Sequence, residues 1–247
     1  FYGNGGIVTD GIKSGDYLPI TEPTRDAGIT TPTATFADCN GKSWTFVGWS
    51  REEIDVTRVP VLTTDLLHDG GGNKHYYIQE DGEEFWAVYT NQGTPETKYG
   101  TITLTGADFD FNTYQTGRLT KEVLGDSYII DYKDVGCPSG SGNGIQIAQT
   151  SGKNGYIMNT TSLGKINSIK FSNFEQGDID DIRVYVGNTP DDITTLLTVE
   201  ELQTVEDAST YYPHKNYSYF KIQSNKYTGI ETISIDFGKG TQVWGTT

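Results

Sequence analysis

The chain has few residues of the kinds that bind nucleic acid. Its 247 residues include 18 lysines and arginines against 33 aspartates and glutamates, which gives a formal net charge of −15. Affinity for nucleic acid depends on basic side chains that displace counterions from phosphates. We therefore expect no nucleic-acid partner, and we interpret the acidity as a source of solubility.

Long apolar segments are also missing. No apolar run is long enough for a helix to span a bilayer, so we predict no membrane span in this segment. The sequence has no charged-then-apolar leader and begins at Phe1 as though inside a strand. We expect an exported fragment whose signal lies upstream.

Cysteine and histidine are scarce. We expect the 2 cysteines, Cys39 and Cys137, to be unpaired thiols, with a bridge between domains as the alternative. The 3 histidines, His68, His75 and His214, match no common zinc spacing, and no Gly-x-Ser-x-Gly turn accompanies them. The sequence therefore predicts no catalytic residue of these kinds.

Glycine and aromatic residues are abundant. The chain has 30 glycines, 16 tyrosines and 10 phenylalanines but a single methionine, which favours strands and tight turns over helices. Residues 91–98 show no apolar periodicity, so we place a domain boundary near residue 94. We predict an all-β protein with domains at residues 1–93 and 94–247.

The second domain contains segments in which apolar and polar residues alternate. In residues 179–186, Ile182, Val184 and Val186 would face one way, while Arg183 and Tyr185 would face the other. Further candidate strands are residues 101–104, 127–132, 144–149, 166–172, 196–198, 217–223 and 231–237. Residues 198–208 fit either a short helix or a strand with its hairpin loop. Short strands separated by glycine turns predict an antiparallel β-sandwich of the jelly-roll or immunoglobulin-like class.

Three phrases of the first domain carry a resemblance. They are residues 2–6 (Tyr-Gly-Asn-Gly-Gly), 46–50 (Phe-Val-Gly-Trp-Ser) and 86–89 (Trp-Ala-Val-Tyr). With them, residues 1–92 resemble the Listeria–Bacteroides repeat, a small β-grasp-like unit of internalin B and of surface proteins of gut bacteria. The resemblance implies a β-grasp-like module with Phe46, Trp49 and Trp86 in its core.

The second domain is similar to the β-sandwich modules that follow this repeat in Bacteroides-type surface proteins. The matching phrases are residues 144–147, 155–161, 165–169, 184–188 and 217–222. The resemblance implies a bacterial cell-surface or extracellular location and a binding or spacer role. It supplies no catalytic residue.

Two groups of residues are candidates for binding. Asp178, Asp180 and Asp181 offer carboxylates for a structural calcium ion, although solvated turn acids are the alternative. A second group combines aromatic rings, which stack on sugars, with polar groups that bind hydroxyls. Its members are Tyr211, Tyr212, His214, Asn216, Tyr217 and Tyr227, with Tyr219 nearby; packing in strands is the alternative for these tyrosines.

We therefore expect a monomeric, non-catalytic binding or adhesion module for glycans or host and matrix glycoproteins. A structural spacer in a larger surface protein is the alternative. A polysaccharide hydrolase is the third reading, based on neighbouring carboxylates such as Glu83 with Glu84 and Asp191 with Asp192.

Overall fold

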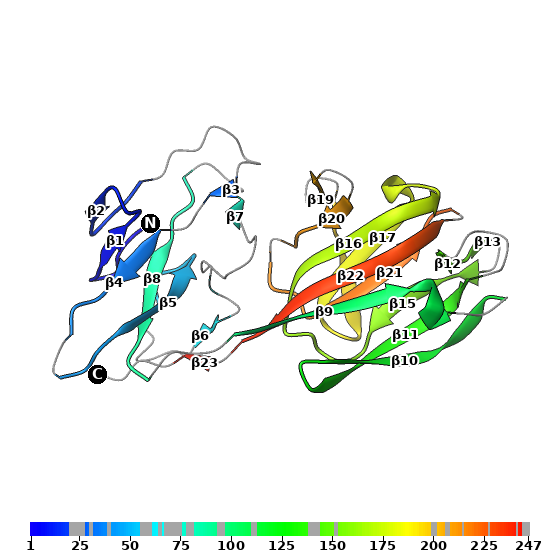
Figure 1. Cartoon of the computed structure of the whole chain (residues 1–247), viewed down its shortest axis with the longest axis horizontal. Coiled ribbons are helices and arrows are strands. Elements are labelled where there is room, and N and C mark those ends of the chain that lie inside the picture. Colours follow the sequence, from blue (N-terminus) through cyan, green and yellow to red (C-terminus); the bar gives the residue numbers. More distant parts are fainter. Residues whose placement is uncertain are drawn as a thin grey trace. The chain divides into compact units, whose positions relative to one another are not determined.

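The chain divides into two compact units (Figure 1). The computed structural model describes residues 1–19, 28–29, 32–38, 41–54, 61–63, 66, 76–77, 82–92, 97–109, 113–137, 144–150, 153–198, 202–205, 208–213, 215–226, 228–240 and 242–243. Unit 1 comprises Phe1–Thr97 and Gly240–Thr247, and unit 2 comprises Lys98–Lys239. Within the described residues, no helix has the length and apolar character needed to cross a membrane.

Unit 1 consists of short strands. They are β1 (Ile7–Thr9), β2 (Ser14–Gly15), β3 (Gly28–Ile29), β4 (Thr33–Thr35), β5 (Thr45–Ser50), β6 (Val61–Leu62), β7 (Tyr76–Tyr77), β8 (Trp86–Thr90) and β23 (Gln242–Val243). Strands β2, β1 and β4 form one sheet, and β3–β7, β5–β8 and β6–β23 form antiparallel pairs. The β6–β23 pair returns the end of the chain to unit 1, whereas the sequence had assigned residues 94–247 to a single second domain.

An aromatic core holds unit 1 together. Trp49 is completely buried, and its ring meets the edges of Phe1 at 4.8 Å and of Phe46 at 5.1 Å between ring centroids. Trp49 Nε1 donates to the carbonyl oxygen of Pro32 at 3.0 Å, so the only polar atom of the indole is satisfied. Trp86, expected in the same core, is half-buried and stacks on Tyr2 instead.

Unit 2 is built from long antiparallel strands. These are β9 (Lys98–Thr105), β10 (Gln115–Val123), β11 (Asp126–Gly136), β12 (Ile145–Ile147), β13 (Gln149–Thr150), β14 (Lys153–Asn154), β15 (Tyr156–Asn159), β16 (Lys165–Gln176), β17 (Ile182–Thr189), β18 (Asp192–Leu196), β19 (Leu202–Val205), β20 (Ala208–Tyr211), β21 (Tyr219–Ser224) and β22 (Gly229–Lys239). Two 3-10 turns, η2 (Gly106–Phe109) and η3 (Ile179–Asp181), connect some of them.

The strands of unit 2 form two layers that share one core. Strands β19, β20, β16, β22 and β9 make one layer, and β10, β11, β15, β21, β17 and β18 make the other (Figure 1). The short strand β12 pairs with both β11 and β22 and so joins the layers. Buried side chains of both layers, among them Phe171 and Phe237 from one and Ile157 and Val184 from the other, form a single cluster. The all-β fold with antiparallel sheets is therefore confirmed.

Alternation along each strand decides which side chains enter this core. In β17, Ile182, Val184 and Val186 are buried, while Arg183 is exposed and Tyr185 is half-buried, as the sequence predicted. Residues Ile179–Asp181 form η3 and precede the strand, so the predicted segment 179–186 starts too early. Residues 198–208, which fitted two structures, contain β19 and the start of β20, a strand pair rather than a helix.

Candidate functional site

A shallow, open depression lies on the outer face of unit 2. It has a volume of about 480 Å³ and is formed by side chains of the neighbouring strands β11, β15, β21 and β17, of the short strand β14 and of the loop after β21. Its lining residues are Lys133, Asn154, Tyr156, Arg183, Tyr185, Lys221, Gln223, Ser224 and Asn225. We call this surface the β15–β21–β17 face. None of its nine lining residues is an aspartate or a glutamate.

Strand register brings these side chains together. Lys133 of β11 stands opposite Tyr156 of β15, and Tyr185 of β17 stands opposite Lys221 of β21. Arg183 is the cross-strand partner of Gln223 in the same β17–β21 pair. Residues of one strand that lie two apart share a face of the sheet, and the inward-facing neighbours of these residues fill the core. The face is consequently supported by a packed sheet rather than by a loop.

Cations and tyrosines alternate across this face. Lys221 Nζ lies 5.2 Å from the centroid of the Tyr156 ring, a cation–π distance, and Lys221 also faces Tyr185 across the strands. Lys133, Arg183 and Lys221 form no ion pair with any residue that the structure describes. Three positive charges without carboxylate partners thus occupy one surface of a chain whose net charge is −15.

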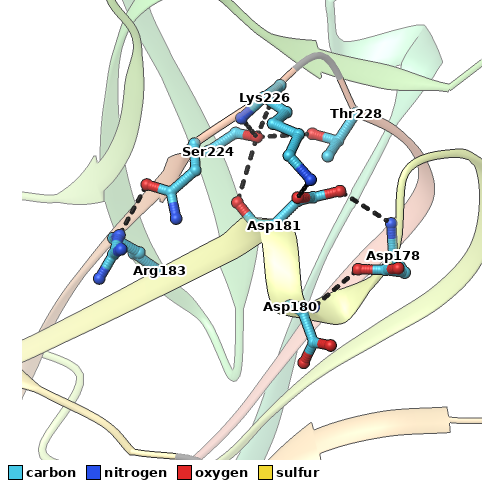
Figure 2. A network of polar contacts seen from close by, with 8 residues as sticks. Asp178, Asp180, Asp181, Arg183, Ser224, Lys226 and Thr228 are labelled. Atoms are coloured by element: carbon cyan, nitrogen blue, oxygen red, sulfur yellow. Dashed lines mark hydrogen bonds and ion pairs between the residues drawn. The ribbon is translucent and has the colours of Figure 1, made fainter.

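A polar network includes Arg183 and Ser224 of the lining (Figure 2). Arg183 Nε donates to Asn225 Oδ1 at 2.6 Å, and the backbone N–H of Asn225 donates to the carbonyl oxygen of Asp181 at 2.7 Å. Ser224 Oγ accepts a hydrogen bond of 3.1 Å from the hydroxyl of Thr228, which is completely buried. These bonds fix the orientation of Arg183 relative to the end of β21.

The aspartates predicted to bind calcium belong to this network. Asp178 Oδ1 accepts from the backbone N–H of Asp180 at 3.0 Å, and an Asp181 carboxylate oxygen accepts from the backbone N–H of Asp178 at 3.4 Å. Asp178 and Asp181 form a capping box around η3, in which the side chain of each accepts from the backbone N–H of the other. Lys226 Nζ lies 2.9 Å from Asp181 Oδ1, and its hydrogen bond lowers the pKa of the Asp181 carboxyl from 3.8 against the opposing effect of burial.

This arrangement is not that of a calcium site. Nowhere in the described part of the chain do three or more His, Cys, Asp or Glu side chains form a group that could hold a metal ion. At η3 the reason is that Asp178 and Asp181 bind backbone amides and that the ammonium of Lys226 already faces Asp181. A cation would have to displace Lys226 or accept its repulsion.

One member of the predicted tyrosine platform faces the core rather than solvent. Tyr211 is 5 % exposed and packs edge-on against Phe171, because the alternation of β20 turns it toward the core opposite Ile169. Burial, with a smaller contribution from Asp180, raises the pKa of its phenol. Tyr217 is half-buried and packs on the same core, Tyr212 is half-buried, and Asn216 is exposed. His214 and Tyr227 lie outside the described residues, as does Cys39.

The neighbouring carboxylates considered for hydrolysis serve local contacts. Glu83 pairs with Arg51 at 2.8 Å, and Glu84 accepts a hydrogen bond from the hydroxyl of Tyr2 at 2.8 Å. In unit 2, Asp192 Oδ1 accepts from the hydroxyl of Thr194 at 2.8 Å. These acids thus stabilise turns and strand ends of two separate units.

A second aromatic surface lies on unit 1. Tyr2 stacks on Trp86, at 5.4 Å between ring centroids, and its ring is tilted against that of Tyr17, at 4.7 Å. The β15–β21–β17 face is the better candidate, since its tyrosines accompany amides and unpaired cations in a depression.

Sequence reasoning missed this surface. Lys133, Tyr156 and Lys221 occur far apart in the chain, and only the outward direction of Arg183 and Tyr185 was readable from the alternation of β17. In comparisons by sequence and by structure, no family model, curated protein or solved structure matches the chain. The resemblance to the Listeria–Bacteroides repeat therefore stays a prediction.

Proposed function

We propose that this protein is a non-catalytic binding module for glycans or glycoproteins and that the β15–β21–β17 face is its binding surface. The observation that carries the proposal is the depression in which Tyr156 and Tyr185 lie beside amide side chains on a packed sheet. The apolar face of a sugar ring packs on an aromatic ring, while amides exchange hydrogen bonds with its hydroxyl groups.

Binding is favoured over hydrolysis by the chemistry of the lining residues. Glycoside hydrolysis ordinarily requires a pair of carboxyl groups that flank the scissile bond. The lining of the depression supplies amides, phenols and cations instead. We further propose, from the resemblance of its sequence phrases, that the protein acts at a bacterial cell surface or outside the cell, where glycans are accessible.

A glycan array followed by calorimetry tests this function. We expect binding to a subset of glycans, and we expect Tyr156→Ala and Tyr185→Ala each to weaken it about tenfold, given that buried aromatic contacts dominate such interfaces. Tyr17→Ala, which changes an exposed tyrosine of unit 1, is the matched control and should leave the affinity unchanged. Absence of any glycan binding would favour the structural-spacer alternative.

A further inference from the structure

The β15–β21–β17 face carries positive charges that the binding of a neutral sugar would not require. From its cations we infer that the ligand is an acidic glycan, an oligosaccharide bearing carboxylate or sulfate groups, held by Lys133, Arg183 and Lys221. This inference rests on the proposed function and specifies the class of sugar. Neither the resemblance nor the overall composition of the chain indicates it, because the chain as a whole is strongly acidic.

The three cations of this face have no carboxylate partner among the described residues. Lys133 and Arg183 are exposed and Lys221 is half-buried. Elsewhere in unit 2, Arg118, Lys121, Lys226 and Lys239 each lie within 2.5 to 2.9 Å of an aspartate oxygen. Lys98 and Lys170 also form no ion pair among the described residues, but they lie outside the depression, whereas Lys133, Arg183 and Lys221 line a hollow whose lining includes no acid.

The guanidinium of Arg183 is oriented for contact with a planar anion. Its Nε is bound to Asn225 Oδ1, which is itself positioned through the backbone contact to Asp181. The two Nη groups make no hydrogen bond with the described residues. A guanidinium held on one side and open on the other suits a bidentate contact with a carboxylate or a sulfate.

The spacing of the cations across the sheet indicates the size of the ligand. Lys133 and Arg183 belong to β11 and β17, which are separated by β15 and β21 in the sheet order. Three strand spacings of about 4.8 Å place the two backbones about 14 Å apart. Charges at both ends, with Tyr156 between them and Tyr185 beside Arg183 on β17, fit an acidic oligosaccharide better than a single sugar.

The charge of the whole chain disfavours nucleic acid as the ligand of this face. A net charge of −15 repels nucleic acid over most of the surface, so the three cations supply only local attraction. Acidic peptides could pair with the cations, yet they present no sugar ring to the tyrosines. We therefore assign the surface to acidic glycans. The experiment also tests RNA and an acidic peptide as ligands.

The experiment uses the intact chain and pairs of glycans that differ only in charge. Calorimetry would compare tetragalacturonate with its methyl ester, and a heparin-derived hexasaccharide with its desulfated form. We expect at least one acidic member to bind about tenfold more tightly than its neutralised partner, and to lose that advantage in high salt as screening predicts. The triple variant Lys133→Gln, Arg183→Gln, Lys221→Gln should lose the same preference.

The control variant replaces three exposed cations outside the depression, Lys13→Gln, Lys98→Gln and Lys170→Gln. Its net charge therefore changes by the same amount as that of the first triple variant. Equal binding of charged and neutral partners overturns the inference but leaves the proposed function standing. Absence of binding to these glycans and to a full array overturns both. Equally tight binding of a single-stranded RNA 12-mer or of a polyglutamate peptide overturns the assignment to glycans.

Discussion

Lys98 and Lys239 are direct cross-strand partners in the β9–β22 pair. They are also the first and last residues of unit 2. The chain therefore enters and leaves this unit at adjacent positions of one sheet, and β23 then pairs with β6 of unit 1. Unit 2 has the connectivity of a domain inserted into unit 1, an arrangement that proteins tolerate when the ends of the inserted domain lie close together.

Excision of residues 98–239 should yield an independently folded unit. The unit has its own core, in which side chains from both layers form one cluster, and both of its ends lie in the β9–β22 pair. We expect a sharp thermal transition of the fragment by circular dichroism, within a few degrees of a transition seen in the whole chain. A gradual, non-cooperative melt of the fragment would contradict this division of the chain.

The Asp181–Lys226 contact should make the stability of unit 2 depend on pH. The pKa of Asp181 is lowered in the folded state, so its contribution is complete above the ordinary value of 3.8 and is lost as pH falls through the folded pKa. We expect Asp181→Asn to lower the melting temperature at pH 7. The difference from the unaltered protein should shrink steadily below pH 3.8.

Asp180→Asn provides the comparison in the same loop. Its carboxylate is exposed, and its backbone N–H donates to Asp178 Oδ1. We expect the melting temperature of this variant to follow that of the unaltered protein at every pH. An equal effect of the two substitutions would show that loss of local charge, rather than the contact with Lys226, explains the change.

Trp49 should be the largest single contributor to the core of unit 1. Trp49→Ala removes a completely buried ring, and such changes cost about 3–5 kcal/mol of unfolding free energy. Trp49→Phe keeps part of the ring but leaves the carbonyl of Pro32 without its donor, at a cost of about 1–3 kcal/mol. Denaturant unfolding monitored by fluorescence measures the unfolding free energy of both variants.

Trp86→Phe is the matched control because Trp86 is half-buried and stacks on Tyr2 at the surface. We expect this variant to lose clearly less stability than Trp49→Phe. If the two variants were equally destabilised, the assignment of Trp49 to the core and of Trp86 to its margin would be wrong.

The sequence predicted those strands in which burial and alternation coincide. In β22 and β17, apolar side chains at every second position enter the core, and both strands were recognisable from this pattern alone. Strand β10 was missed because most of its residues are polar and none is buried, as suits an edge strand. Its turn into β11 uses Leu124 and Gly125, both with positive φ, where an Asn-Gly pair would have been the usual signal.

Only part of the candidate surface could be predicted from the sequence. Alternation in β17 determines that Arg183 and Tyr185 face outward, but strand register across β11, β15 and β21 determines what lies beside them. The exposure of Tyr211 was predicted wrongly for a related reason. Whether Tyr211 faces solvent or core depends on the register of β20 against β16, which opposes it to the buried Ile169.

The most direct test of the binding surface is an NMR titration of the isotope-labelled protein with the acidic glycan that binds most tightly. We predict that the largest amide shifts arise at Lys133, Tyr156, Arg183, Tyr185 and Lys221, and that the triple Gln variant loses them. Shifts centred instead on residues 211–217 or on Tyr2 and Tyr17 would contradict the account, as would a saturating titration that leaves β15, β17 and β21 unchanged.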